Sequence, residues 1–205
     1  MNTHASRPLR LGFLASRNGS SLRAIVDAAR LGRLDVDPRI VISNNSTAAA
    51  LTFAAEKGLA HACIPTRSDP AAADQALVRA LEAAGVELVV LSGYLRRLGP
   101  ATLARYRNRV LNIHPGPLPR FGGEGMYGRR VHEAVIASGA AESGIAIHLV
   151  DEEYDRGPIV AARAVPLEPG ETVDSLEARI TALEPAFFVE TLRRIAQGEL
   201  KLPPA

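Results

Sequence analysis

The chain has 205 residues, of which 47% are hydrophobic and 22% are charged, and its formal net charge at pH 7 is +2. This composition is typical of a globular protein with one substantial core. No run of Lys and Arg forms a basic tail, so the charge gives no reason to expect nucleic acid as a partner.

The single cysteine and the lack of long apolar stretches exclude further classes of protein. Cys63 alone allows no internal disulfide and no all-cysteine metal site, and we expect it to be a small, buried hydrophobic residue. No stretch is long and apolar enough to cross a membrane, and the N-terminus "MNTHASRPLR" lacks the apolar core of a signal peptide. We therefore expect a cytoplasmic protein that binds no membrane, and we expect no role for His4.

Strands and helices alternate in the first half of the chain. The segment "VELVVLSG" is almost wholly apolar, as in a strand that is buried on both faces. Leu22, Ile25, Val26 and Ala29 share one helical face after the turn "RNGSS". The expected strands cover 9–16, 39–45, 60–65 and 86–93, and further helices cover 47–57 and begin at Asp69. This alternation predicts βα units with parallel strands.

Three more strands and a long helix are expected in the second half. The strands cover 109–115, 144–150 and 158–167, and the last two should pair. The helix begins at about Thr172, carries Leu176, Ile180, Leu183 and Phe187 on one stripe, and should be kinked by Pro185. No linker divides the chain. The prediction is an α/β fold: an open, mostly parallel twisted sheet with helices on both faces, in a single domain.

The turn "SRNGSSL" between the first strand and the first helix is a candidate phosphate site. A helix N-terminus offers unpaired N–H groups and a positive dipole end, and Gly19 allows close approach of a ligand. Asn18 tolerates unusual turn angles, and Ser20 or Ser21 can cap the helix or bind a phosphate oxygen. Neither the dinucleotide fingerprint nor the Walker pattern is present. The segment is therefore either an ordinary capped turn or a site for one phosphate of a mononucleotide.

Asn112 and His114 are the strongest candidates for catalysis. Residues i and i+2 of a strand point to the same side, so "VLNIH" presents this pair together at the end of a strand. We expect Pro115, Pro117 and Pro119 to hold the following chain extended. The glycines of "FGGEGMYG" permit close backbone approach. These turn residues would clear space beside two side chains that can form hydrogen bonds. The alternative is that His114 is structural, as a lone His at the end of a strand more often is.

An acidic loop, "VDEEYDRGP", follows a later strand. Its four acids, Asp151, Glu152, Glu153 and Asp155, form either a solvated loop or the source of a carboxylate for His114. We expect Asp155 to pair with the imidazolium and to raise its pKa, because Gly157 and Pro158 fix the exit of the loop.

No metal site and no hydrolase motif is expected. His132 on a helix and His148 on a strand lack zinc-ligand spacing, and His148 is expected to be packed or hydrogen-bonded within the sheet. The sequence has no G-x-S-x-G motif, which argues against a serine hydrolase.

These motifs resemble those of a known enzyme family. "NIHP" followed later by "HLVDEEYDRGP" is similar to the folate-dependent formyltransferases. "SRNGSSL", "SNN" and "LSGYLRRL", each after a predicted strand, resemble the branch that acts on glycinamide ribonucleotide. The resemblance covers residues from about 9 to 202.

The resemblance implies a formyltransferase fold with a Rossmann-like N-terminal half. It implies transfer of the formyl group of 10-formyltetrahydrofolate, a cosubstrate, to the amine of glycinamide ribonucleotide in purine biosynthesis. It also implies small-molecule partners only, no metal, and a monomer or homodimer. The single domain 1–205 would bind phosphate and nucleotide through 9–100, with catalysis and folate binding in 101–205.

The resemblance also implies roles for residues. Asn112 would hydrogen-bond the formyl oxygen, His114 would stabilise its charge and transfer protons, and Asp155 would orient His114 and favour its charged form. The ribonucleotide would be held by Asn18, Gly19, Ser20, Ser21 and Glu184. The folate would be held by Leu95, Arg96, Arg97, Leu98, Asn112, Asp151, Glu152, Glu153, Tyr154 and Asp155.

The chain departs from the family pattern in three places, and other functions stay open. "HPGPLP" places Gly116 and Pro117 where the family usually has Ser and Leu, and "GGEGMYGRR" is longer than in the shortest members. An Arg that some relatives place near Asp69 for the folate tail is missing, and Arg67 is its possible substitute. The alternatives are a formyltransferase for another amine, a formyltetrahydrofolate hydrolase, or a non-catalytic nucleotide- or folate-binding module.

Overall fold

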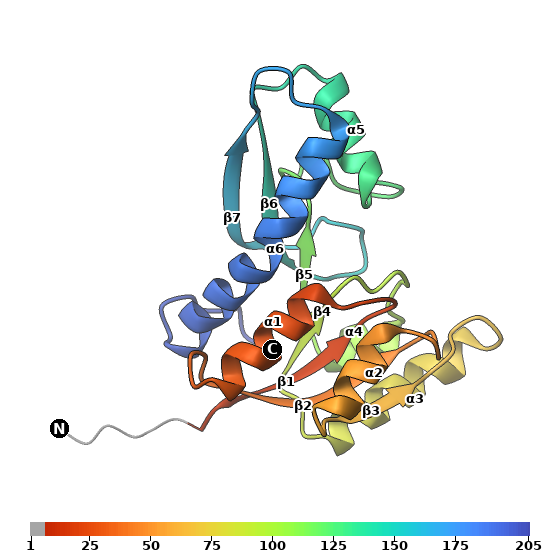
Figure 1. The fold of residues 1–205 in the computed structure, drawn as a ribbon. Helices are drawn as coiled ribbons and strands as arrows, with labels where there is room; N and C mark the ends of the chain where they lie inside the picture. The colour runs from red at the N-terminus through yellow and green to blue at the C-terminus, as the bar shows by residue number, and fades with distance from the viewer. Residues whose placement is uncertain (1–6) are drawn as a thin grey trace.

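In the computed structural model, which describes residues 7–205, one sheet of seven strands carries helices on both faces (Figure 1). His4 lies outside the described residues. The strands are β1 (Leu9–Leu14), β2 (Val36–Ser43), β3 (Ala60–Cys63), β4 (Leu88–Leu91), β5 (Val110–His114), β6 (Glu142–Leu149) and β7 (Ile159–Pro166). The helices are α1 (Ser20–Arg30), α2 (Ala49–Glu56), α3 (Pro70–Ala83), α4 (Pro100–Arg105), α5 (Arg129–Ala137) and α6 (Val173–Ala196).

The sheet has the order β3-β2-β1-β4-β5-β6-β7 and is parallel from β3 to β5. β6 and β7 are antiparallel to their neighbours and form one edge. The predicted α/β fold with a mostly parallel open sheet is therefore confirmed, as is the pairing of the last two strands. The order reverses between β1 and β4, and ligands of open α/β sheets bind outside the carboxyl ends of strands at such a point.

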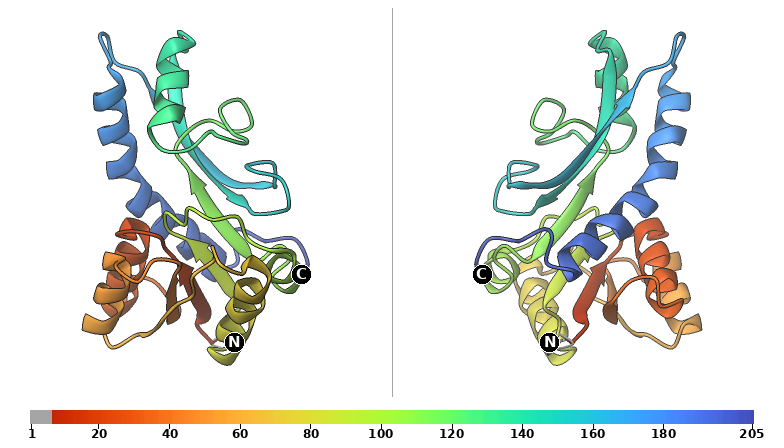
Figure 2. Two further views of the ribbon diagram at one scale, coloured as in Figure 1. Left: turned by 90° about the vertical axis from the view of Figure 1, so that its right-hand side faces the viewer. Right: turned by 90° about the vertical axis from the view of Figure 1, so that its left-hand side faces the viewer.

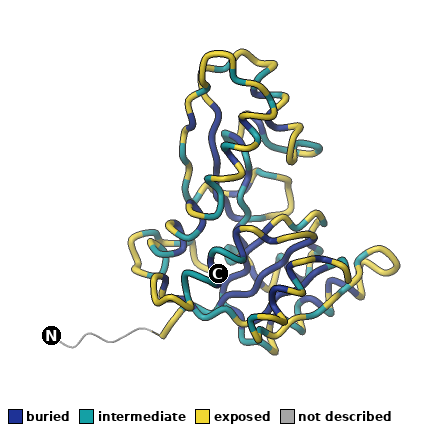
Figure 3. Tube along the Cα trace, viewed as in Figure 1, coloured by how far each residue is buried: buried dark blue, intermediate teal, exposed yellow. Residues whose placement is uncertain are grey.

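Two hydrophobic clusters, one on each face, hold the helices on the sheet. One contains Leu11 and Phe13 of β1 together with buried residues of α1, α2, α5 and α6. The other contains Leu14 of β1 together with residues of α3 and the chain just after α4. β4 is buried along its whole length, as predicted for an apolar strand covered on both faces. Figure 3 shows this buried centre beneath exposed connecting loops. Within the described residues, no helix has the length and apolar character needed to span a membrane.

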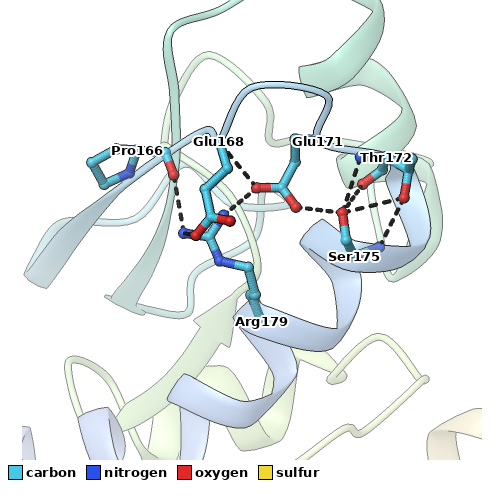
Figure 4. Close-up of polar contacts among 6 residues, drawn as sticks. All are labelled: Pro166, Glu168, Glu171, Thr172, Ser175 and Arg179. Atoms are coloured by element: carbon cyan, nitrogen blue, oxygen red, sulfur yellow. Dashed lines mark hydrogen bonds and ion pairs between the residues drawn. The ribbon is translucent and has the colours of Figure 1, made fainter.

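Helix α6 ties the antiparallel edge to the parallel part, because it packs on both α5 and α1. Pro185 lies inside this helix, and Figure 2 shows the helix axis changing direction in its middle, as predicted. The start of α6 is fixed by a capping box in which Thr172 Oγ1 accepts a hydrogen bond from the N–H of Ser175 at 3.1 Å. Glu171 binds both Ser175 and Arg179 (Figure 4), so the connection from β7 is held in place.

Three local expectations differ from the structure. Cys63 is exposed rather than buried, because β3 is a short edge strand. The chain after His114 does not stay extended: residues 118–121 form a turn, and the N–H of Phe121 donates to the carbonyl of Pro117 at 3.0 Å. α4 was not expected, since six residues are too few for a periodic pattern; Asp74 fixes its start by accepting from Ala101 N at 2.8 Å.

Candidate active site

The candidate site begins at Asn112, where the sheet changes from parallel to antiparallel. On one side of β5, the last paired residue of β4, Leu91, lies opposite Asn112. On the other side, antiparallel pairing places His148 of β6 opposite Asn112. Because β4 ends at this level, Asn112 is only partly buried although its strand is interior. The two side chains touch, with Asn112 Nδ2 3.1 Å from His148 Nε2.

Backbone contacts fix which atoms of this pair donate. His148 Nδ1 lies 2.9 Å from the carbonyl of Leu149, and a carbonyl only accepts, so Nδ1 carries a hydrogen. Nε2 is then a lone pair and accepts one N–H of the Asn112 amide. This orientation leaves the second N–H of Asn112 free to donate to another acceptor.

In His114 the hydrogen is held on the other ring nitrogen. Its Nε2 lies 2.7 Å from the carbonyl of Phe121, so Nε2 carries the hydrogen. Nδ1 lies 3.5 Å from Oδ2 of Asp155, which is too long for a strong hydrogen bond, and it remains the nitrogen that can take a proton. The turn that sequence reasoning missed is what brings the Phe121 carbonyl back to His114.

Asp155 lies between the two imidazoles. Oδ1 is 3.4 Å from His148 Nε2, and Oδ2 accepts the N–H of Gly123 at 3.0 Å. The Asp155 backbone has a φ of 56°, a left-handed conformation that a short polar side chain tolerates. The side chain is only 11% exposed. The acidic loop therefore does deliver one carboxylate to His114, and it is the one expected from the sequence.

The pKa of His114 moves opposite to the expectation. Burial lowers the pKa of His114 below its ordinary value of 6.5, and the raising effects of Asp155 and of the Phe121 carbonyl are smaller. Burial also acts to raise the pKa of Asp155, whereas the charge that His114 can carry and the N–H of Gly123 act to lower it, and the pKa of Asp155 lies below its ordinary value. At neutral pH the pair is a neutral imidazole beside a carboxylate. Asp155 thus does not hold a resting imidazolium; it faces the nitrogen that would become one.

The phosphate turn lies at the start of α1. Gly19 has a left-handed φ of 67°, and no side chain caps the helix. The N–H of Leu22 donates to Ser92 Oγ at 3.0 Å, whereas the N–H groups of 19–21 have no recorded acceptor within the described residues. Ser16 joins this region to the turn after β4, because its Oγ accepts the N–H of Leu95 at 2.8 Å. The start of α1 therefore lies beside the chain that follows β4.

The two predicted folate segments meet through one residue. Arg97 donates to the carbonyl of Glu152, and its guanidinium lies 5.6 Å from the centre of the Tyr154 ring. A cavity of about 310 Å³ is lined by residues of the 94–99 turn and of α3. Arg67, Arg96 and Arg97 line it, but none of the Asn112, His114 and Asp155 cluster does. The cavity is thus separate from the cluster. The Nε of Arg96 is buried and has no protein partner.

Glu184 is not joined to the other candidate residues by any recorded polar contact in the part of the chain that is described. Burial raises the pKa of Glu184 to about 7. Its carboxyl group thus lacks a protein donor.

His148 is the residue that the sequence did not assign to the site. The signal was available, because pairing of the last strands with β5 places His148 beside Asn112. Residues 7–205 hold no cluster of three or more His, Cys, Asp and Glu side chains suited to a metal.

The sequence also matches a known family. The pattern of the family described as Formyl transferase matches residues 9–192. The chain belongs to the formyl transferase family. This confirms the resemblance that the motifs indicated and, with it, the enzyme class.

Named relatives cover nearly all of this formyl transferase. It is 34% identical over 191 residues to phosphoribosylglycinamide formyltransferase of Escherichia coli (strain K12), which covers 92% of this chain and 88% of the relative. It is 36% identical to the chloroplastic phosphoribosylglycinamide formyltransferase of Vigna unguiculata over 95% of this chain, and it spans 63% of that relative's length. Glycinamide ribonucleotide transformylase 1 from Symbiobacterium toebii superposes with a TM-score of 0.87 at 34% identity, covering 99% of this chain and 95% of that structure.

Gly116 of this formyl transferase, one of the departures from the family pattern, has no room for a side chain. A Cβ there would lie 2.5 Å from Val131 Cγ1. We expect Gly116→Ala to lower the free energy of unfolding by about 1–3 kcal/mol through overpacking. In a Val131→Ala background the same change should cost clearly less. Urea denaturation of the four proteins measures this, and an equal cost in both backgrounds would contradict the contact.

The raised pKa of Glu184 predicts a pH-dependent stability. Between pH 4.5 and about 7 the unfolded chain has lost this proton while the folded protein still holds it, so stability falls as pH rises through that window. A shift of this size is worth about 3 kcal/mol. Relative to wild type, Glu184→Gln should therefore gain stability between pH 5 and pH 8, measured by urea denaturation. Parallel pH profiles for the two proteins would rule out a buried, unpaired carboxyl.

Proposed function

We propose that the protein transfers the formyl group of 10-formyltetrahydrofolate to the amine of glycinamide ribonucleotide, giving formylglycinamide ribonucleotide and tetrahydrofolate. The reaction would be a step of purine biosynthesis in the cytoplasm. It would need no metal, nucleic acid or membrane, and a monomer or homodimer would suffice. The observation that carries the proposal is the cluster in which one free N–H of Asn112 and one free lone pair of His114 lie beside Asp155.

Asn112 would stabilise the charge that develops on the formyl oxygen. Attack of the amine on the formyl carbon forms a tetrahedral intermediate, so a donor must sit where the oxyanion appears. His148 accepts one N–H of the Asn112 amide and thereby prevents the amide from turning its oxygen toward the substrate. His148 is thus a positioning residue, acting through Asn112.

His114 would move the proton. The attacking amine must lose a proton as its bond to carbon forms, and the folate N10 must gain one as its bond to carbon breaks. Nδ1 of neutral His114 can accept the first proton, and the resulting imidazolium pairs with Asp155. The lowered pKa of His114 keeps the ring neutral and ready to accept. The same group can then return the proton to N10.

The roles of the binding residues are those that the resemblance implies. The division of the domain into a nucleotide-binding half and a folate-binding half is likewise a prediction. The N–H groups of Gly19, Ser20 and Ser21, with Asn18 beside them, would hold the substrate phosphate. Glu184 would accept hydrogen bonds from the ribonucleotide, which supplies the donors that the protein does not. The segments 95–98 and 151–155 would hold the pterin, and the arginine-lined cavity would receive the acidic tail of the folate through Arg67 and Arg96.

Activity should require both substrates. Purified protein should release tetrahydrofolate from 10-formyltetrahydrofolate only when glycinamide ribonucleotide is present. Asn112→Ala should lower kcat about 10²–10³-fold by removing an oxyanion donor, and His114→Ala should lower it by at least about 10²-fold with binding largely intact. The wild-type rate should fall on the acid side at a pH below 6.5, as His114 becomes protonated.

His61→Ala is the matched control, because His61 is exposed on the far edge strand. It should leave turnover and the pH profile unchanged. Folate release without the amine would instead identify a hydrolase, release with a different amine would identify another formyltransferase, and binding without turnover would identify a non-catalytic module. Near-normal turnover of His114→Ala would overturn its assigned role.

A further inference from the structure

The loop that carries Asp155 is anchored at its ends and exposed at its tip. At one end, the N–H of Val150 donates to the carbonyl of Val110 at 2.9 Å; at the other, the carbonyl of Pro158 accepts the N–H of Leu149 at 2.9 Å. The tip, residues 151–154, is exposed throughout. Its one internal side-chain hydrogen bond joins Asp151 Oδ1 to the N–H of Glu153 at 3.0 Å. Little within the loop itself fixes the position of the tip.

Arg97 supplies the missing restraint from the turn after β4. Its guanidinium donates to the carbonyl of Glu152 and stacks over Tyr154 with 5.6 Å to the ring centre. We call these three residues the Arg97 tether. The turn that carries Arg97 is itself firmly placed, because Leu98 is buried in the core and the N–H of Leu95 donates to Ser16. The tether thus joins the exposed tip to a fixed turn.

Apolar surface is exposed on both of the segments that the tether joins. Leu95 is 49% exposed and Tyr154 is 46% exposed. These two side chains place apolar surface on each of the two segments that the proposed function assigns to the folate. A flat heteroaromatic ring is the class of ligand that both an aliphatic side chain and a phenol ring can cover.

We propose that Arg97 is a positioning residue for the folate cosubstrate, an inference that rests on the proposed function. The Arg97 tether holds the tip at 151–154 against the 94–99 turn, so that both folate-binding segments are in place before the pterin arrives. Preorganisation of this kind raises affinity by lowering the ordering cost of binding. It acts on folate affinity and leaves the chemistry at Asn112 and His114 alone.

The kinetic test compares Arg97→Ala with wild type. KM for 10-formyltetrahydrofolate should rise about 3- to 10-fold, because a guanidinium–aromatic contact and a charged hydrogen bond are lost. In contrast, kcat and the KM for the ribonucleotide should change less than about twofold. Tyr154→Ala should raise the same KM, and the rise in the double variant should be smaller than the product of the two single rises, because the Arg97–Tyr154 contact is lost in each. Arg97→Lys should recover only part of the affinity, because lysine lacks the planar fork.

Arg156→Ala is the matched control, since Arg156 is an exposed arginine of the same loop that has no recorded partner. Hydrogen exchange of the free protein provides a readout that needs no activity: the amide of Glu153, whose N–H donates to Asp151, should exchange faster in Arg97→Ala than in wild type or Arg156→Ala. Unchanged exchange would overturn the tether, as would equal rises in KM for both substrates. An inactive wild type with faster exchange in Arg97→Ala would refute the proposed function but leave the tether standing without its folate role.

Discussion

Two backbone carbonyls decide the chemistry of this site. The carbonyl of Leu149 accepts a hydrogen bond from Nδ1–H of His148. The carbonyl of Phe121 accepts one from Nε2–H of His114. Two similar side chains are thereby held as opposite tautomers on either side of Asp155. One orients an amide donor, and the other keeps a basic nitrogen toward the carboxylate. Neither role could be exchanged without moving the backbone, because the acceptors are parts of the β6 strand end and of the turn after β5.

The fold supplies these constraints through strand length and direction. β4 ends level with Asn112, while β5 continues to His114, so the polar end of β5 is uncovered on one side. On its other side the antiparallel β6 places His148 in register with Asn112. A parallel strand at this position would run the opposite way and would present a different register. The antiparallel edge of an otherwise parallel sheet is therefore part of the site as well as of the scaffold.

Much of this was predictable from the sequence, and the failures have physical reasons. The βα alternation, the i and i+2 placement of Asn112 and His114, and the choice of Asp155 follow from local rules that hold without knowing the tertiary structure. The turn at 118–121 was missed because prolines restrict single residues without fixing the direction of the chain. The pKa of His114 was misjudged because a charge partner can be read from a motif, whereas the depth of burial cannot. The place of His148 in the site required the register of two strands. Arg97 was expected to bind folate, but its contact with Glu152 and Tyr154 depends on how two loops pack.

One departure of the chain from its family pattern also becomes intelligible. Gly116 packs against α5, with Val131 filling the space that a Cβ would need.

The central claim is the pair of opposite tautomers, and nitrogen NMR of the protein labelled with ¹⁵N-histidine measures it directly. At pH 7.5, with His114→Asn and His148→Asn used to assign the signals, the ring hydrogen should be found on Nε2 of His114 and on Nδ1 of His148. A His114 ring that carries its hydrogen on Nδ1, or on both nitrogens, at this pH would contradict the account.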